Sequence, residues 1–224
     1  MKIMMNFGQA FVAVSDKSDG NMKIMASNDE TRVMANQQKF LAGAGLDAEQ
    51  TFFVKVSYDT ADFCQFAVAS DINALALEQQ TERCDGLVTN KKHHGIFLPL
   101  ADCVGVVLYH AASQHLMVVH CGRQTVLQNG AERAVQYLAE IAHSSPESFS
   151  AWLSPAAGPG NYPLHELGGI GLHEAVTQQL THAGVKPEMI TRSDIDTTTA
   201  ANYFSHSQGD RLDRFAIVAA IRDV

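Results

Sequence analysis

Apolar and polar residues alternate in short runs along the sequence, and the densest apolar run lies near the middle. Residues 103–110 (CVGVVLYH) are β-branched and almost wholly apolar, which is typical of a central strand buried on both faces. The polar stretch 111–114 (AASQ) then predicts a turn, and 115–121 (HLMVVHC) predicts a strand that pairs back. We therefore expect an antiparallel hairpin here.

Further strands and helices mix along the rest of the chain. Continuous or alternating apolar runs predict strands at 9–15, 51–59, 84–90, 95–102 and 189–196, and a strand or a short helix at 215–223. Helical spacing of apolar residues predicts helices at 28–46, 126–143 and 173–185. No linker or internal repeat interrupts these elements. They indicate one domain over residues 1–224, of the α+β (mixed α/β) class, with layered sheets.

The first predicted helix carries clear start and stop signals. Asn28 or Asp29 can cap its amino end, and acidic residues follow in the first turn. Val33, Phe40 and Leu41 supply its apolar face. Glycines at 43 and 45 are expected to end it.

Composition narrows the classes of partner. The 224 residues are 46% hydrophobic and 18% charged, which is ordinary for a globular protein. The net charge of −8, with no long basic run, argues against duplex nucleic acid or an anionic membrane surface as a partner. No window approaches the ~18 apolar residues of a membrane span, and no signal peptide is recognised. We expect a cytoplasmic protein whose four cysteines are free thiols, since none form a CxxC pair.

The predicted hairpin brings a thiol and an imidazole together. Cys103 lies about nine residues before the centre of the turn and His120 about eight after it, so the two should nearly face each other. They could be two ligands of a zinc ion that needs a third, or a nucleophile and its base, or simply parts of the core. Asp102 could orient an imidazole or cap the strand.

A second candidate is an anion site directly after the hairpin. A strand, a turn at Gly122 and a helix place residues 121–125 at a helix amino end, where free N–H groups favour anions. Gly122, Arg123 and Thr125 are the candidate phosphate-binding residues.

Other polar clusters are weaker candidates. His93 and His94 follow two lysines in a turn, and His206 lies in a polar loop; these side chains are expected in solvent, although His94 and His206 could reach the site. Asp194, Asp196 and Asp210 form a solvated face or, less plausibly, a carboxylate metal site.

Several motifs resemble those of a known family. CDGLVTN (84–90), ADC (101–103) and VHCG (119–122) resemble the D-A-L-V-T, T-A-D-C and V-H-A-G-W-R-G motifs of the laccase-domain proteins. These proteins have also been called multicopper polyphenol oxidases, peptidoglycan editing factors and purine nucleoside phosphorylases. Supporting matches cover most of the chain, at 28–46, 153–164, 178–185 and 203–221.

The resemblance implies a fold and a chemistry. The fold would be layered, with mixed β-sheets and outer helices. The family holds one zinc through His, Cys and His, and acts on purine nucleosides by phosphorolysis and, in some members, deamination. Cys103 and His120 match the second and third of these ligands, whereas Ser57 stands at the position of the first, a histidine. His94, His206 or Cys121 could replace it.

Other family positions also differ, which marks a divergent member. The family's tryptophan after His120 is absent. The arginine that follows it in the family is either absent or shifted by one position, to Arg123. Asp196–Thr197 stand where the family has Cys-Thr, and 205–208 lack the arginine pair.

Three functions stay open at this point. The first is a zinc-dependent enzyme whose partners are a purine nucleoside and phosphate, a phosphorylase and hence a transferase. The second is a catalytically degenerate binding or regulatory member of the same fold. The third is a metal-free hydrolase that uses Cys103 and His120. Copper oxidation is disfavoured because the chain has no H-x-H pattern. The oligomeric state is left open.

Overall fold

Two mixed β-sheets form the centre of the molecule. The computed structural model describes residues 2–25, 29–56, 58–69 and 83–223. The first sheet has the order β1-β2-β11-β6-β3. Its strands are β1 (Lys2–Phe7), β2 (Ala10–Val14), β11 (Phe215–Ile221), β6 (Gly95–Leu100) and β3 (Thr51–Phe53). The second sheet has the order β10-β9-β7-β8-β5-β4. Its strands are β10 (Ile190–Arg192), β9 (Phe149–Leu153), β7 (Val104–His110), β8 (His115–Cys121), β5 (Gly86–Thr89) and β4 (Phe66–Val68).

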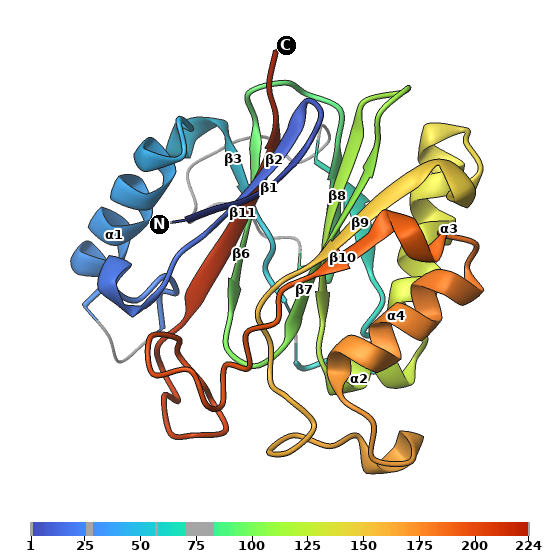
Figure 1. Cartoon of the computed structure of the whole chain (residues 1–224). Helices are drawn as coiled ribbons and strands as arrows, with labels where there is room; N and C mark the ends of the chain where they lie inside the picture. Colours follow the sequence, from blue (N-terminus) through green and yellow to red (C-terminus); the bar gives the residue numbers. More distant parts are fainter. Residues whose placement is uncertain (1, 26–28, 57, 70–82, 224) are drawn as a thin grey trace.

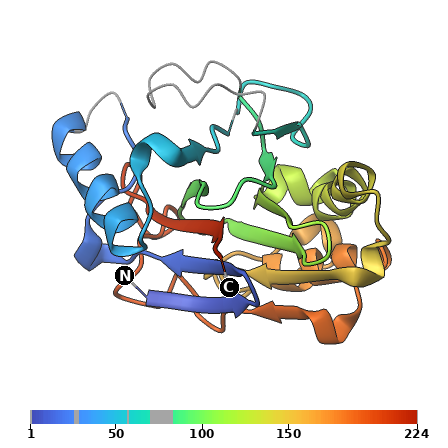
Figure 2. The same ribbon diagram turned by 90° about the horizontal axis from the view of Figure 1, so that it is seen from above.

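Helices cover the outer faces of both sheets (Figures 1 and 2). Helix α1 (Glu30–Gly43) packs Phe40 and Leu41 against the first sheet. The second sheet is covered by α2 (Arg123–Leu127), α3 (Gly130–Ala142) and α4 (Leu172–His182). Short 3-10 turns lie at Lys17–Asp19, Ala48–Gln50, Pro146–Ser148, His165–Leu167 and Pro187–Met189. The result is the layered α+β fold with outer helices that the sequence predicts.

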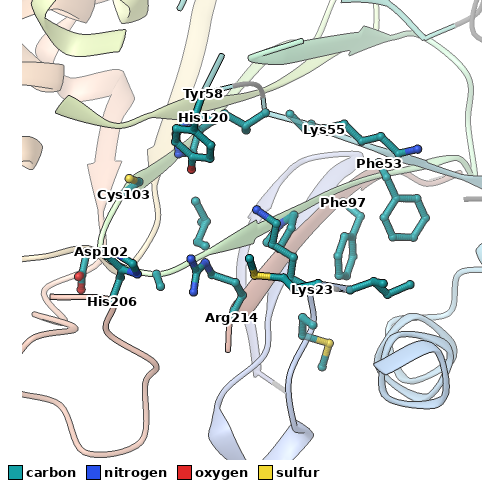
Figure 3. A pocket seen from close by; sticks show the side chains of 18 of the residues that line it. Lys23, Phe53, Lys55, Tyr58, Phe97, Asp102, Cys103, His120, His206 and Arg214 are labelled. Atoms are coloured by element: carbon teal, nitrogen blue, oxygen red, sulfur yellow. The ribbon is translucent and has the colours of Figure 1, made fainter. Parts of the chain in front are cut away.

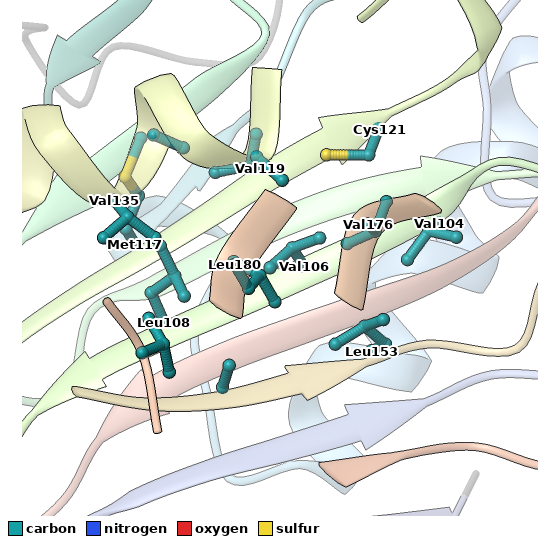
Figure 4. Close-up of a cluster of buried hydrophobic side chains, with 14 of the residues drawn as sticks. Val104, Val106, Leu108, Met117, Val119, Cys121, Val135, Leu153, Val176 and Leu180 are labelled. Carbon is teal, nitrogen blue, oxygen red and sulfur yellow. The ribbon is translucent and has the colours of Figure 1, made fainter. Parts of the chain in front are cut away.

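Strand β7 is buried on both faces, as its composition predicts. Val106 and Leu108 point to the helices, where they pack with Val176 and Leu180 of α4 (Figure 4). The alternate residues of β7, including Val107, face the other sheet. Because both faces are covered, an unbroken apolar sequence is what this strand requires.

The hairpin register decides which side chains share a face. Strands β7 and β8 are antiparallel, with Gly105 opposite His120 and Val104 opposite Cys121. Successive side chains of a strand point to opposite faces. Cys121 therefore joins the helix-side core (Figure 4), and His120 points to the space between the sheets.

The predicted helix at 126–143 is wrong in one respect, because the structure has two helices there. Helix α2 ends at Leu127, Asn129 adopts a left-handed conformation (φ 57°), and α3 begins at Gly130. A Cβ on Gly130 would lie 2.3 Å from Thr125 Cγ2, so a glycine at this position lets α3 begin close to α2.

Other boundaries also differ from the sequence expectation. The strand predicted over 51–59 is shorter: β3 ends at Phe53, and the residues after it line a cavity. The strand predicted over 189–196 is reduced to the three residues of β10. Residues 215–221 are a strand, which settles that alternative. Strands β1, β4 and β9 were missed. The first helix is confirmed: Asp29 caps it by accepting a hydrogen bond from Arg32 N, and it ends at Gly43.

No helix in the part of the chain that the structure describes combines the length and the apolar character needed to cross a bilayer.

Candidate functional site

A cavity of about 990 Å³ lies at the end of the sheets where Cys103 and His120 lie, and it extends to the α1 side of the first sheet, where Gln37 and Phe53 line it. Its walls come from the segments that follow β2 and β3, from the β6–β7 connection, from β8 and from the segment that precedes β11 (Figure 3). Apolar side chains such as Phe53 and Phe97 line one part of it. Polar and charged side chains line the remainder, including Lys23, Asp102, His206 and Arg214.

Cys103 and His120 converge on one point of this cavity. Cys103 directly precedes β7 and His120 lies on the neighbouring strand β8. A Cβ placed on Gly122 would lie 3.0 Å from Cys103 Sγ and 3.1 Å from His120 Cε1. Glycine at this position therefore leaves room for both side chains. The juxtaposition that the spacing predicts is present in the structure.

Burial keeps this pair in its neutral forms. Burial, reinforced by the neighbouring Asp102 carboxylate, raises the pKa of Cys103 to about 12. Burial also lowers the pKa of His120 to about 4, and the charges of Lys23 and Arg214 act in the same direction. At neutral pH the pair is a thiol and an uncharged imidazole. The Nδ1 atom of His120 is buried and has no hydrogen-bond partner among the described residues.

Asp102 organises the loops beneath the pair. It is buried and has a left-handed backbone (φ 77°), which aspartate tolerates better than most residues. Its Oδ1 accepts a hydrogen bond from Thr197 Oγ1 at 2.8 Å, and its Oδ2 accepts one from Ser207 N at 2.7 Å. Of the two roles that the sequence left open, orienting an imidazole is supported by no hydrogen bond among the described residues. The carboxylate instead joins segments distant in sequence.

The three candidate replacements for a zinc ligand lie in different places. His94 Nδ1 pairs with the carbonyl oxygen of Lys92 at 2.9 Å, and its ring stacks on Phe52. Cys121 is in the helix-side core. His206 lines the cavity, near Asp102 in Figure 3. Ser57, at the family's first ligand position, lies outside the described residues.

The described residues do not complete a zinc site. No group of three His, Cys, Asp or Glu side chains among them could hold a metal ion. Cys103 and His120 offer two suitable donors, whereas a catalytic zinc is held by three protein ligands. Among the described residues, the donor set therefore falls one ligand short.

The predicted anion site after the hairpin has other contacts. Arg123 pairs with Glu166 at 2.7 Å, donates to the carbonyl oxygen of Pro163 and lies over the Tyr162 ring. Thr125 is buried within α2, a helix of five residues. Gly122 lies beside the Cys103–His120 pair, as described above. Neither Arg123 nor Thr125 is among the described residues that line the cavity.

Lys23, Tyr58 and Arg214 are cavity residues that the sequence reasoning missed. The Tyr58 ring lies edge-on to His120 with 6.4 Å between ring centroids, and Lys23 Nζ lies 5.8 Å from the centre of the Tyr58 ring. All three lie in irregular segments of the structure. The apolar pattern places Tyr58 in a strand predicted over 51–59, whereas the strand ends at Phe53. Arg214 immediately precedes the last strand and lies within 203–221, the stretch that resembles the family's closing segment, and these two signals could have drawn attention to it.

Asp196 and Asp210, two of the three acidic residues singled out with Asp194 from the sequence, hold separate loops. Asp196 Oδ1 accepts hydrogen bonds from Gly158 N and from Thr198. Asp210 accepts one from Ser205 N and forms an ion pair with Lys17 at 3.1 Å. The sequence suggested a carboxylate metal site as one alternative. The described part of the chain has no group of three donors that could form it.

The buried carboxyl of Asp85, whose backbone is hydrogen-bonded to that of His120, makes the stability of the fold depend on pH. Its carbonyl oxygen accepts from His120 N, while its Oδ1 is buried without a partner in the described structure. Burial raises the pKa of Asp85 to about 6. The folded state therefore favours the protonated carboxyl. The free energy of unfolding falls as the pH rises from about 4 to 6, and it stays at the lower value above pH 6.

We expect Asp85→Asn to raise the melting temperature at pH 8 by about 2–4 °C and to give no gain at pH 4. Scanning fluorimetry across this pH range measures the effect. Glu188→Gln, at an exposed position, should show no such pH-dependent gain. A wild type that is more stable than Asp85→Asn at pH 8 would contradict the expectation.

Comparison with known proteins identifies the family. Residues 10–167 match the family model described as multi-copper polyphenol oxidoreductase laccase. This match covers well over half of the chain. The chain therefore belongs to this family, and the resemblance seen in the sequence is confirmed.

Relatives and solved structures extend this result. A protein of Xylella fastidiosa named purine nucleoside phosphorylase is 29% identical over 161 residues, which are 61% of this chain and 60% of that protein. The match thus spans about three-fifths of its length. The crystal structure of YfiH from Bacillus licheniformis has a TM-score of 0.87 at 20% identity, covering 98% of this chain and 96% of that one. YlmD from Geobacillus stearothermophilus has a TM-score of 0.81 at 22% identity, covering 97% and 93%. These structures share the fold.

Proposed function

We propose that this chain binds a purine nucleoside in the cavity, and that it lacks the zinc-dependent turnover implied by the family. The ligand class comes from the relatives named purine nucleoside phosphorylase. The proposed loss of turnover comes from the donor set, since Cys103 and His120 have no third metal ligand among the described residues.

The observation that carries this proposal is the cavity itself. Its volume of about 990 Å³ lies at the upper end of the range for small-molecule sites, so a nucleoside has room in it. Tyr58, which lines the cavity beside His120 and is 66% exposed, offers aromatic surface on which a purine can pack. His120 offers a buried ring nitrogen without a partner in the described structure, which a polar ligand atom could satisfy.

Phosphorolysis is the second candidate, and the persistence of the Cys103–His120 pair in one cavity favours it. A metal-free hydrolase is disfavoured, because a thiol with a pKa of about 12 is not a thiolate at neutral pH. The imidazole beside it has a pKa of about 4, which makes it a weak base.

The test uses chelator-treated protein with inosine, adenosine and, for comparison, cytidine. We expect inosine or adenosine to raise the melting temperature and cytidine to have less effect. Chromatography with phosphate present should detect no release of free base. His120→Ala should lose most of the ligand-induced shift, whereas His94→Ala, the same change outside the cavity lining, should keep it.

Failure of every purine nucleoside to bind would overturn the proposal. Phosphate-dependent release of free base would replace it with phosphorolysis. An equal ligand-induced shift in wild type and His120→Ala would place the nucleoside away from this pair.

A further inference from the structure

The loop that follows β9 brings a second tyrosine to the cavity. Tyr162 is half-buried, and its ring packs on the edge of the helix-side core and also lines the cavity. Desolvation of the Tyr58 hydroxyl and the nearby Cys103 raise the pKa of Tyr58 to about 12, and Tyr162 is one of the neighbours that add to the increase. Tyr162 therefore borders the same end of the cavity as Tyr58 and His120.

A single arginine holds this tyrosine in place. Cζ of Arg123 lies 5.1 Å from the centre of the Tyr162 ring, over its face. Its Nη2 donates to the carbonyl oxygen of Pro163 at 3.0 Å, and its Nη1 donates to Glu166 Oε2 at 2.7 Å. These three contacts fix the segment 162–166 relative to the start of α2.

The first part of the same loop is fastened to Asp102, which directly precedes Cys103 in the sequence. Ala157 N donates to the carbonyl oxygen of Asp102 at 2.8 Å. The next residue, Gly158, donates from its N atom to Asp196 Oδ1 at 2.9 Å. The loop is thus tied on both sides of its tyrosine. A ring that is held before the ligand arrives loses little freedom when a ligand packs against it.

A phenol ring held in this way suits a flat, uncharged ligand group. Aromatic side chains bind nucleobases by stacking, and the two fused rings of a purine offer more contact area than the single ring of a pyrimidine. Arg123 is not among the described residues that line the cavity, whereas Tyr162 is. Any effect of Arg123 on a ligand in the cavity should therefore pass through Tyr162.

We propose that the Tyr162 ring packs against the purine of a bound nucleoside, and that Arg123 is the positioning residue that sets this ring. The inference deepens the proposed function and rests on it. It gives Arg123 a role that differs from the anion contact expected from the sequence, because its guanidinium is already paired with Glu166. It also makes the preference for a purine over a pyrimidine depend on stacking.

Calorimetric titration of the full chain with inosine and with cytidine tests the inference. Tyr162→Leu should weaken inosine binding by roughly tenfold, because it removes a stacking surface, and should narrow the difference from cytidine. Tyr162→Phe should keep most of the affinity. Arg123→Met should weaken inosine binding in the same direction, and Arg123→Lys, which can still pair with Glu166, should restore part of it. Arg133→Met, which removes an exposed pair with Asp62, is the matched control and should leave the affinity unchanged.

Fluorine NMR of protein labelled with fluorotyrosine separates a contact from a change in the fold. Saturating inosine should move the resonance of Tyr162, which Tyr162→Phe identifies. It should leave the resonance of Tyr109 in place, since Tyr109 is buried and is not among the described residues that line the cavity. In Arg123→Met the Tyr162 resonance should already be displaced without a ligand. The first measurement is made on the wild-type protein, so it decides the contact even if Tyr162→Leu does not fold.

The outcomes separate this inference from the proposed function. Equal inosine affinity in wild type and Tyr162→Leu, or a Tyr162 resonance that saturating inosine does not move, overturns the inference, while inosine binding itself upholds the proposed function. An Arg123→Met variant with wild-type affinity and an undisplaced Tyr162 resonance overturns the positioning role of Arg123. No binding of any purine nucleoside to the wild type removes the proposed function, and the inference with it.

Discussion

Replacing Ser57 with histidine is expected to raise the affinity of this protein for Zn²⁺ by roughly 100-fold or more. Losing a residue that only hydrogen-bonds a metal ligand lowers metal affinity by about 10–100-fold, and gaining a ligand itself should change it at least as much. The family resemblance puts residue 57 at the position of its first histidine ligand. Cys103 and His120 already converge on one point of the cavity. Histidine at 57 would complete a His-Cys-His set. Competition with a chromophoric chelator measures the change.

Two further variants make this result specific. Ser57→Ala should bind zinc with the same affinity as the wild type, since a hydroxyl contributes little beside an imidazole. Adding Cys103→Ser to Ser57→His should abolish the gain. A wild type that binds zinc as tightly as Ser57→His would show that the chain already supplies a third ligand, and the proposed loss of turnover would then lose its basis.

The second large effect concerns the reactivity of Cys103. At neutral pH we expect iodoacetamide to alkylate this thiol roughly 1000-fold more slowly than an ordinary exposed cysteine. The thiolate is the reactive form, and its fraction falls about tenfold for each unit by which the pKa exceeds the usual value near 8.5. Burial and Asp102 raise the pKa of Cys103 to about 12. Because the pKa is raised, the rate should increase as the pH rises.

Mass spectrometry of the labelled peptides separates Cys103 from the other three cysteines, all of which are free and buried. Protein unfolded in urea should lose the protection and provides the control. Alkylation of Cys103 at an ordinary rate in folded protein near pH 7 would contradict the account. It would favour the metal-free hydrolase, in which His120 activates the thiol.

The hairpin at the centre of the site could be predicted because its periodicity is simple. An apolar run, a short polar turn and a second apolar run define the pairing, and counting from the turn places Cys103 near His120. The same counting places Cys121 on the opposite face. The break between α2 and α3 could not be predicted, because it depends on how closely Gly130 approaches Thr125.

The proximity of Lys23 and Arg214 in the cavity could not be predicted from the sequence, for a different reason. Asn21 joins Lys23 to Arg214, which lies 193 residues further along the chain than Asn21. Asp102 likewise bonds to Thr197 and Ser207, 95 and 105 residues away. These contacts arise only when the loops of the first sheet and the connection before β11 come together. Local patterns carry no information about them.

A crystal structure of this protein with inosine tests the central claim most directly. We expect the nucleoside in the cavity, in contact with Cys103 and His120, with no zinc held by three protein side chains. Inosine bound elsewhere, or a fully coordinated zinc on Cys103 and His120, would contradict it.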